Sequence, residues 1–314
     1  MFQASDILFF YVETPLHAGT GAGLGAVDLP IQRERVTGYP LIQASSIKGV
    51  LRGIAEEEKG EKSPEVITAF GPEATNASAH AGAFSPGDAR LLLFPVRSLL
   101  GIFAWTTSRH ALSRFVRDVN LAGQKIEWSV PELPADGDGG EKALICTDDD
   151  ISADGQVVLE EFSFQAQKSE EVSKIANWLA ENALPAGDEY AYWRDALKKR
   201  LIILPEDDFR EFTRFSTEVV TRVRLNEKKT VERGALWTEE YLPTDTLLYA
   251  PVYATKPRSN KPPEGWSKAE DVLGFVREIV TSQGRAQIGG NETIGRGIVA
   301  LRWIGSKDKE EPNE

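Results

Sequence analysis

Few residues of this chain have the type and placement that chemistry on a substrate requires. The stretch HAGTGAGLGAVDLPIQRERVTGYP, residues 17–40, is crowded with glycine in its first half and holds one carboxylate there, Asp28. A carboxylate on a loop can bind a divalent cation, or position and deprotonate an attacking hydroxyl. The alternative is a turn residue whose side chain bonds its own backbone, and spacing alone does not choose between the two.

His17 opens the same stretch. A histidine beside a glycine loop can act as a general acid or base at neutral pH. A hydrogen-bonded structural role is the alternative for a lone histidine. His80 and His110 stand at no metal-ligand spacing from His17, so the histidines do not predict a metal site of their own.

A second group of residues is suited to binding anions. QASSIKG at 43–49 places Ser45, Ser46 and Lys48 at the start of a predicted helix, where free N–H groups and the helix dipole attract negative charge. Arg52 follows Lys48 by one helical turn, so both can face the same anion. Ordinary helix capping by Ser45 is the alternative interpretation.

A second glycine loop, IGGNETIGRG at 288–297, lies between two apolar segments. Gly289, Gly290 and Asn291 would let another backbone approach closely, and Arg296 could pair with a phosphate. The alternative is a plain hairpin with a long glycine turn.

A predicted hairpin joins basic and aromatic residues. Strand 219–225 carries Arg222 and Arg224 on one face, and its mate 231–241 carries Trp237 and Tyr241, with the turn at 226–229. Bases beside aromatic rings suit contacts with single strands or duplex ends of RNA. A solvated, half-buried hairpin without a ligand is the alternative.

Several enzyme classes are disfavoured. GAGLGA at 21–26 matches a loose dinucleotide fingerprint, but Pro30 and the missing apolar periodicity argue against the helix that should follow, and no phosphate-loop GK[ST] is present. The single cysteine, Cys146, excludes an internal disulfide and a cysteine-based zinc site. No cofactor or nucleophile motif of a metabolic enzyme is evident.

The composition is that of a soluble globular protein of 314 residues with 41% hydrophobic and 27% charged residues. No apolar run approaches the roughly 20 residues that span a bilayer, and MFQASDILFF lacks the features of a signal peptide, so we expect a cytoplasmic protein without membrane contact. The net charge of −12 comes mostly from 132–161, whereas 210–233 has more bases than acids. Local patches decide phosphate binding more than the total charge does.

The elements that must position these residues alternate along the chain. Strand–helix–strand order occurs twice, which predicts an α+β fold of ferredoxin type with helices packed on one face of an antiparallel sheet. We expect one domain over 1–304, an acidic insertion near 131–155 and a disordered tail at 305–314. Predicted strands cover 7–12, 90–96, 157–164, 219–225, 231–241, 246–254, 285–288 and 297–304. Predicted helices run from Ser45 or Ser46 to about Lys59, from Ser108, and over 169–182, 188–201 and 268–281.

Five blocks in order resemble one known family. They are the opening stretch followed by SSIKGVLRG, then FPVRSLLGIFAWTTS, GALWTEEYLP and GGNETIGRG. The chain is similar to the repeated backbone subunit of the type III-B CRISPR effector, the fourth subunit of the Cmr complex, within the repeat-associated (RAMP) superfamily. One departure is Ala44, which stands where that family usually has glycine.

The resemblance implies a ferredoxin-like or RNA-recognition-motif-like palm with a hairpin thumb. It implies a protein that stacks head to tail with copies of itself and with other Cmr subunits along a CRISPR guide RNA, and that cleaves complementary target RNA. Asp28 takes the place of an aspartate needed for cleavage with a divalent metal, Mg or Mn. Guide contacts fall on Ser45, Ser46, Lys48, Arg52 and the 289–297 loop, and the thumb on about 219–241.

Glu239 and Glu240, at the end of the thumb, are candidates for accessory acids, with plain surface charge as the alternative. Two other functions remain open. One is a catalytically inactive RNA-binding subunit of a related CRISPR complex, in which Asp28 is a turn residue. The other is a metal-independent ribonuclease that processes CRISPR RNA precursors, with His17 as acid or base.

Overall fold

The computed structural model describes residues 2–23, 25–73, 78–134 and 141–305. Its central element is β1 (Ala4–Val12), whose sequence ILFFYV lacks polar alternation. Leu8 and Phe10 pack into one hydrophobic cluster, and Ile7 and Phe9 pack into another. A strand that is buried on both faces is expected to be a continuous apolar run, and this burial pattern explains the sequence.

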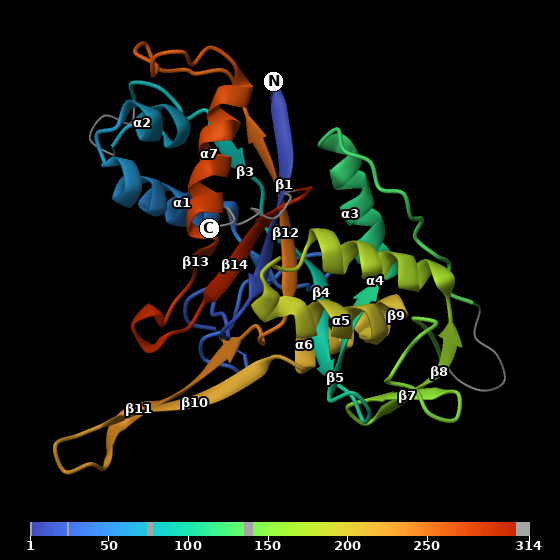
Figure 1. Ribbon diagram of the computed structural model, residues 1–314. Helices are drawn as coiled ribbons and strands as arrows, with labels where there is room; N and C mark the ends of the chain where they lie inside the picture. The colour runs from blue at the N-terminus through green and yellow to red at the C-terminus, as the bar shows by residue number, and fades with distance from the viewer. Residues whose placement is uncertain (1, 24, 74–77, 135–140, 306–314) are drawn as a thin grey trace.

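The core of the sheet has the predicted ferredoxin arrangement. In chain order it comprises β1, α1 (Ala44–Lys59), β4 (Ala89–Arg97), β12 (Leu247–Ala254), α7 (Ala269–Gln283) and β14 (Ile298–Trp303). The strands lie side by side in the order β14–β1–β12–β4, and all neighbours are antiparallel. This is the strand order of a ferredoxin-like palm, so the α+β prediction is confirmed (Figure 1).

Inserted strands widen this core into a sheet of 12 strands. Beyond β4 lie β5 (Phe103–Ser108), β9 (Leu201–Leu204), β6 (Lys142–Ile145), β8 (Phe162–Lys168) and β7 (Gln156–Leu159). At the other edge, β13 (Arg285–Gln287) pairs with β14, while β2 (Leu41–Ile42) and β3 (Phe84–Pro86) add short pairings to β4 and β12.

Helices cover both faces of the sheet, so the expectation of helices on one face is wrong. One cluster holds α1, α2 (Pro64–Phe70) and α7, together with Phe209 and Phe212 of α6 (Glu206–Phe215). The other holds α3 (Arg109–Leu121), α4 (Glu170–Asn182) and α5 (Ala191–Arg200). These last helices come from the insertion between β5 and β9, and their apolar stripes bury the second face.

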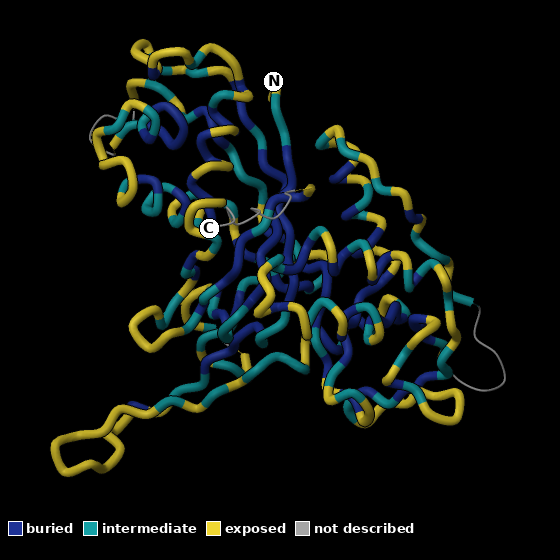
Figure 2. Tube along the Cα trace, in the orientation of Figure 1, coloured by how far each residue is buried: buried dark blue, intermediate teal, exposed yellow. Residues whose placement is uncertain are grey.

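The predicted hairpin is confirmed and projects from the body of the molecule (Figure 1). It is a separate sheet of two strands, β10 (Glu218–Leu225) and β11 (Val231–Tyr241). Asn226 closes the turn, because its side-chain oxygen accepts from the backbone of Lys228 and Thr230. Figure 2 shows the outer part of the hairpin exposed and its base buried against the palm.

Two local predictions need correction. Gln43, not Ser45 or Ser46, is the N-cap of α1, and the Asp88 carboxylate accepts from the Ala44 N–H at 2.8 Å. The segment 157–164 forms two strands, because the chain reverses at Glu160, whose φ is 52°. The predicted acidic insertion and tail fall partly on 135–140 and 306–314, outside the described residues.

Among the described residues, no helix combines the length and the apolar composition needed to cross a membrane.

In the described part of the acidic region 132–161, several carboxylates pair with bases of the same chain. These pairs are Asp148–Lys199, Asp149–Lys168, Asp150–Arg200 and Glu160–Arg97.

The packing of Phe115 gives a test of the second face. Its side chain is fully buried and lies against the rings of Phe9, Trp128, Trp178 and Tyr249. Phe115→Ala should lower the free energy of unfolding by about 3–5 kcal/mol, measured by urea denaturation, since it leaves a cavity. Leu121→Ala on the same helix, where Leu121 is 69% exposed, should change it by less than about 0.5 kcal/mol. Equal effects of the two substitutions would contradict this packing.

Candidate nucleic-acid interface at the base of the hairpin

Three segments far apart in the sequence meet where the hairpin joins the palm. They are the first glycine loop (17–31), the base of β11 (237–241) and the second glycine loop (288–297). Leu29 forms a parallel bridge with Glu239 of β11. The N–H of Gly290 donates to the His17 carbonyl at 2.9 Å. The structure therefore brings the predicted residues of both glycine loops and of the hairpin into one place.

Asp28 is exposed and is held by Thr238 of β11. Its Oδ2 accepts from the Thr238 N–H at 2.7 Å and from Thr238 Oγ1 at 2.9 Å, and its own N–H donates to that hydroxyl at 3.0 Å. The hydrogen bonds from the backbone and then the side chain of Thr238 lower the pKa of the Asp28 carboxyl. Its hydrogen bonds with the described residues run to Thr238 of β11 and not to its own loop, which differs from the contact that the turn-residue alternative expects.

Glu240 is the residue that joins the loop to the hairpin. Its Oε2 accepts from the Ile31 N–H at 3.0 Å, and its Oε1 accepts from Arg33 at 2.5 Å and from Thr217 at 2.8 Å. The residue is only 5% exposed, so its surface-charge interpretation is wrong. Both oxygens are taken up by these contacts, which gives Glu240 a structural role in this conformation.

Glu239 points to the opposite face of β11, because successive side chains of a strand alternate. It is also 5% exposed and accepts from Trp237 Nε1 at 2.7 Å, Asn291 Nδ2 at 2.9 Å and the Tyr241 hydroxyl. Burial alone would raise its pKa, but these hydrogen bonds and the charge of Arg222 lower it. Burial and the Glu239 carboxylate raise the pKa of Tyr241 to about 12, so its hydroxyl stays protonated and donates.

Arg296 of the second glycine loop stacks over the Tyr241 ring, with 5.0 Å between Cζ and the ring centroid. Gly289 lies in the same loop with φ 91°, and a Cβ there would lie 2.3 Å from the His17 carbonyl oxygen. Only glycine permits this approach of the two loops. The predicted site residues of 289–297 therefore pack directly on His17 and the hairpin base.

His17 is half-buried beside Tyr241, with 5.5 Å between ring centroids. Its Nδ1 lies 2.7 Å from the Glu240 carbonyl, which can only accept, so Nδ1 carries a proton. Nε2 then lies over Gly19, and a Cβ added to Gly19 would come within 2.4 Å of this nitrogen. This orientation leaves Nε2 as the nitrogen that could exchange a proton with a ligand.

The predicted anion site at the start of α1 lies beside this centre, and Gln32 links the two. The Gln32 N–H donates to the Ala18 carbonyl at 2.7 Å, and the Gln32 Nε2 donates to the Gly19 carbonyl at 3.0 Å. The Gln32 Oε1 accepts from the Gln43 N–H at 3.3 Å. Ser45 and Ser46 fall in the first turn of the helix.

Lys48 is half-buried, and burial together with the charges of Arg52 and Arg258 lowers its pKa. Arg52 also pairs with Glu56 at 2.6 Å. Arg52 and Arg258 therefore both lie within electrostatic reach of Lys48. Glu56 compensates the charge of Arg52, whereas a phosphate bound near Lys48 would relieve the repulsion that these like charges exert on it.

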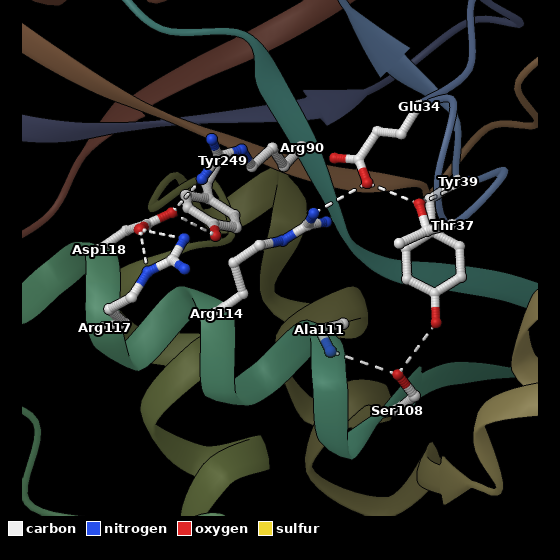
Figure 3. Close-up of polar contacts among 10 residues, drawn as sticks. All are labelled: Glu34, Thr37, Tyr39, Arg90, Ser108, Ala111, Arg114, Arg117, Asp118 and Tyr249. Carbon is white, nitrogen blue, oxygen red and sulfur yellow. Dashed lines mark hydrogen bonds and ion pairs between the residues drawn. The ribbon is translucent and has the colours of Figure 1, made fainter.

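The second half of the opening stretch is tied to α3 (Figure 3). Arg114 donates to Glu34 at 2.8 Å, Thr37 donates to the same carboxylate at 2.6 Å, and the Tyr39 and Ser108 hydroxyls lie 3.3 Å apart. These contacts fix the chain between the first glycine loop and α1. The segment therefore holds the loop and the start of α1 in place relative to α3.

Arg222 and Arg224 lie on the hairpin itself. Arg222 is opposite Trp237 in the register and lies 4.0 Å from Glu239. Arg224 lies at a register irregularity in β10, between Val223 and Leu225, and pairs with Glu232 at 2.5 Å. The predicted placement of bases beside aromatic residues is present at Arg222, whereas Arg224 is farther out on the exposed arm.

Three contributors were not found by sequence reasoning: Thr238, Gln32 and Arg258. Thr238 lies in the quoted block GALWTEEYLP but carries no motif of its own. Gln32 and Arg258 lie outside the predicted helices and strands. Only the fold brings them to the candidate residues.

Within the described residues, no group of three or more His, Cys, Asp or Glu side chains could hold a metal ion by itself. Asp28 offers one exposed carboxylate whose hydrogen bonds to Thr238 use Oδ2. Mg²⁺ commonly keeps several waters and binds one or two carboxylates together with substrate phosphates. The Asp28 carboxylate fits a hydrated ion of this kind that is shared with a bound phosphodiester.

Comparison with known proteins places this geometry in a family. The model of the RAMP superfamily matches residues 9–300. A curated relative from Pyrococcus furiosus, named CRISPR system Cmr endoribonuclease Cmr4, is 41% identical over 93% of this chain and 92% of its own. The crystal structure of oligomeric Cmr4 from Pyrococcus furiosus is 32% identical, with a TM-score of 0.70 over 97% of this chain and 99% of that chain.

A chain in the cryo-EM structure of the type III-B Cmr-beta complex bound to cognate target RNA has the same fold. It is 23% identical, with a TM-score of 0.72 over 96% of this chain and 98% of that chain. The resemblance noted in the sequence is therefore confirmed by sequence and by structure. The chain belongs to the RAMP superfamily and, within it, to the Cmr4 family.

Proposed function

We propose that this chain is a CRISPR RNA-binding backbone subunit of a type III-B Cmr complex and an endoribonuclease that cleaves target RNA complementary to the guide. The observation that carries the proposal is the junction of both glycine loops with the hairpin base, where the Asp28 carboxylate is exposed and oriented by Thr238. The relative named as an endoribonuclease, aligned over 93% of this chain, supports the activity.

In this proposal the palm binds guide backbone and the hairpin meets the guide–target duplex. Base pairing supplies sequence specificity while the protein contacts backbone and shape, as in other RNA-guided effectors. Ser45, Ser46, Lys48, Arg52 and the 289–297 loop contact the guide. Arg222, Arg224 and Trp237 belong to the hairpin that separates base pairs.

Cleavage in this proposal is an in-line displacement. The 2′-oxygen of a target nucleotide displaced by the hairpin forms a new bond to the adjacent phosphorus, and the 5′-oxygen of the next nucleotide leaves and takes up a proton. Asp28 positions the 2′-hydroxyl and accepts its proton, while His17 in its imidazolium form, with a proton on each ring nitrogen, supplies the Nε2 proton to the leaving oxygen. Stacked A-form RNA resists this alignment, so positioning provides most of the rate.

A divalent ion, Mg²⁺ or Mn²⁺, bound by Asp28 and RNA phosphate would supply stabilisation of the charge that develops on phosphate oxygens. Glu239 and Glu240 stay accessory in this proposal, since their oxygens are engaged within the protein. Their effect on cleavage is to hold the hairpin base and the loops together.

The proposed partners follow from the same comparisons. Copies of the chain associate head to tail into a filament, and other Cmr subunits complete the complex; the crystal structure of oligomeric Cmr4 supports self-association. We place the complex in the cytoplasm, where guide and target RNA meet.

Replacing Asp28 by Asn tests the catalytic assignment. The amide keeps an oxygen to accept from Thr238 but loses the charge, so cleavage should fall by at least about 10²-fold while assembly and guide retention stay unchanged. The measurement is the cutting rate of complementary RNA by the assembled complex in magnesium, with analysis of the product ends for 2′,3′-cyclic phosphate.

Asp207→Asn is the matched control for Asp28→Asn, because the Asp207 side chain is 85% exposed on α6. It should cut at the rate of the unmodified complex. Undiminished cleavage by Asp28→Asn would contradict the catalytic assignment of Asp28, whereas a complex that cuts no target RNA even without the substitution would support the inactive RNA-binding subunit. Cutting of precursor RNA by the isolated chain in a chelator would instead support the processing ribonuclease.

Lys48→Gln tests the guide site. It removes one phosphate contact, so the affinity for single-stranded RNA should fall, and the slope of log affinity against log salt should become shallower by about 0.7. Fluorescence anisotropy of labelled RNA at several salt concentrations measures both quantities. Lys125→Gln, at an exposed lysine after α3, should leave the slope unchanged. Equal slopes for Lys48→Gln and the unmodified chain would remove Lys48 from the guide site.

A further inference from the structure

The contact between Asp28 and Thr238 is reciprocal, which distinguishes it from an ordinary hydrogen bond on an exposed loop. The Thr238 hydroxyl donates to Asp28 Oδ2 at 2.9 Å and accepts from the Asp28 N–H at 3.0 Å, and the Thr238 N–H donates to the same Oδ2 at 2.7 Å. One residue therefore fixes both the backbone and the carboxylate of Asp28.

The backbone around this contact extends the same connection. The Leu29 N–H donates to the Thr238 carbonyl and the Glu240 N–H donates to the Leu29 carbonyl, both at 3.0 Å. Leu29 thus forms an isolated parallel bridge to β11, directly after Asp28. Any movement of the hairpin base moves the Asp28 carboxylate with it.

We propose that Thr238 is the positioning residue of Asp28 and couples the seating of the hairpin on RNA to the alignment of the cleaving carboxylate. This inference rests on the proposed function of Asp28. It adds a residue that touches neither RNA nor metal and acts through Asp28. It also gives the hairpin a second task besides separating base pairs, because the element that displaces the target nucleotide carries the group that orients Asp28.

The hydroxyl of Thr238 is the part of the side chain that makes this contact, since it donates to Asp28 Oδ2 and accepts from the Asp28 N–H. Removing the hydroxyl would leave the Thr238 N–H as the donor to Oδ2. The carboxylate would then be less well oriented, so the cleavage step should slow while binding of the target RNA stays the same.

The test uses Thr238→Val and Thr238→Ser in the assembled complex, with the single-turnover cleavage rate of complementary RNA and the affinity for that RNA both measured. Valine keeps the shape of the strand residue but loses the hydroxyl. It should cut about 10-fold more slowly, because a small misplacement of a reacting group is costly, while its affinity for the target RNA stays unchanged. Serine keeps the hydroxyl and should restore the rate.

The controls separate this inference from the proposed function. Thr281→Val, at an exposed position on α7, should behave as the unmodified complex, and guide retention should be equal in all variants. If Thr238→Val does not assemble, Thr238→Ala takes its place. Cleavage that depends on Asp28 but is unchanged in rate by Thr238→Val would overturn the inference alone. A slow valine variant that serine does not rescue would also overturn it, whereas loss of Asp28 dependence would overturn the proposed function.

Discussion

The buried carboxylate of Glu240 is the interaction on which the arrangement of this site depends. It joins Ile31 of the first glycine loop, and Arg33 directly after that loop, to Thr217 at the foot of the hairpin. A buried charge is stable only when partners satisfy it, so separating the loop from the hairpin would leave this carboxylate uncompensated. The loop and the hairpin base are therefore expected to behave as one unit, and Asp28 lies between them.

Glu239 makes the equivalent connection on the other face of β11. Its contacts to Asn291 and Tyr241 bring the second glycine loop onto the hairpin base. Two adjacent acids of one strand thus fix two loops that are more than 200 residues apart in the sequence. The ferredoxin-like palm supplies the rigid support, since β1 and β14 lead into these loops.

Much of the fold could be predicted because its elements have clear periods. The apolar run of β1, the spacing in α1 and the alternation in the hairpin are local properties that packing reinforces. The second helical face could not be predicted, since the inserted helices after Ser108 do not reveal which face of the sheet they cover. The start of α1 was missed because the carboxylate that accepts from the Ala44 N–H belongs to Asp88, 44 residues away.

The candidate site was predictable in its parts but not in its connections. Asp28 was selected through the family resemblance, while Thr238, 210 residues away, has no sequence signal that links it to Asp28. Glu239 and Glu240 suggested surface charge because adjacent acids at the end of a hairpin are commonly exposed. Here loops cover both faces of the strand, and only the tertiary structure reveals this.

The most direct test is a structure of the assembled complex with guide RNA and a target carrying 2′-deoxy nucleotides at the cut sites, which cannot be cleaved. The account predicts that the hairpin displaces a target nucleotide and that the Asp28 carboxylate, still bonded to Thr238, lies beside the scissile phosphate. A scissile phosphate positioned at another part of the surface, with Asp28 facing solvent, would contradict it.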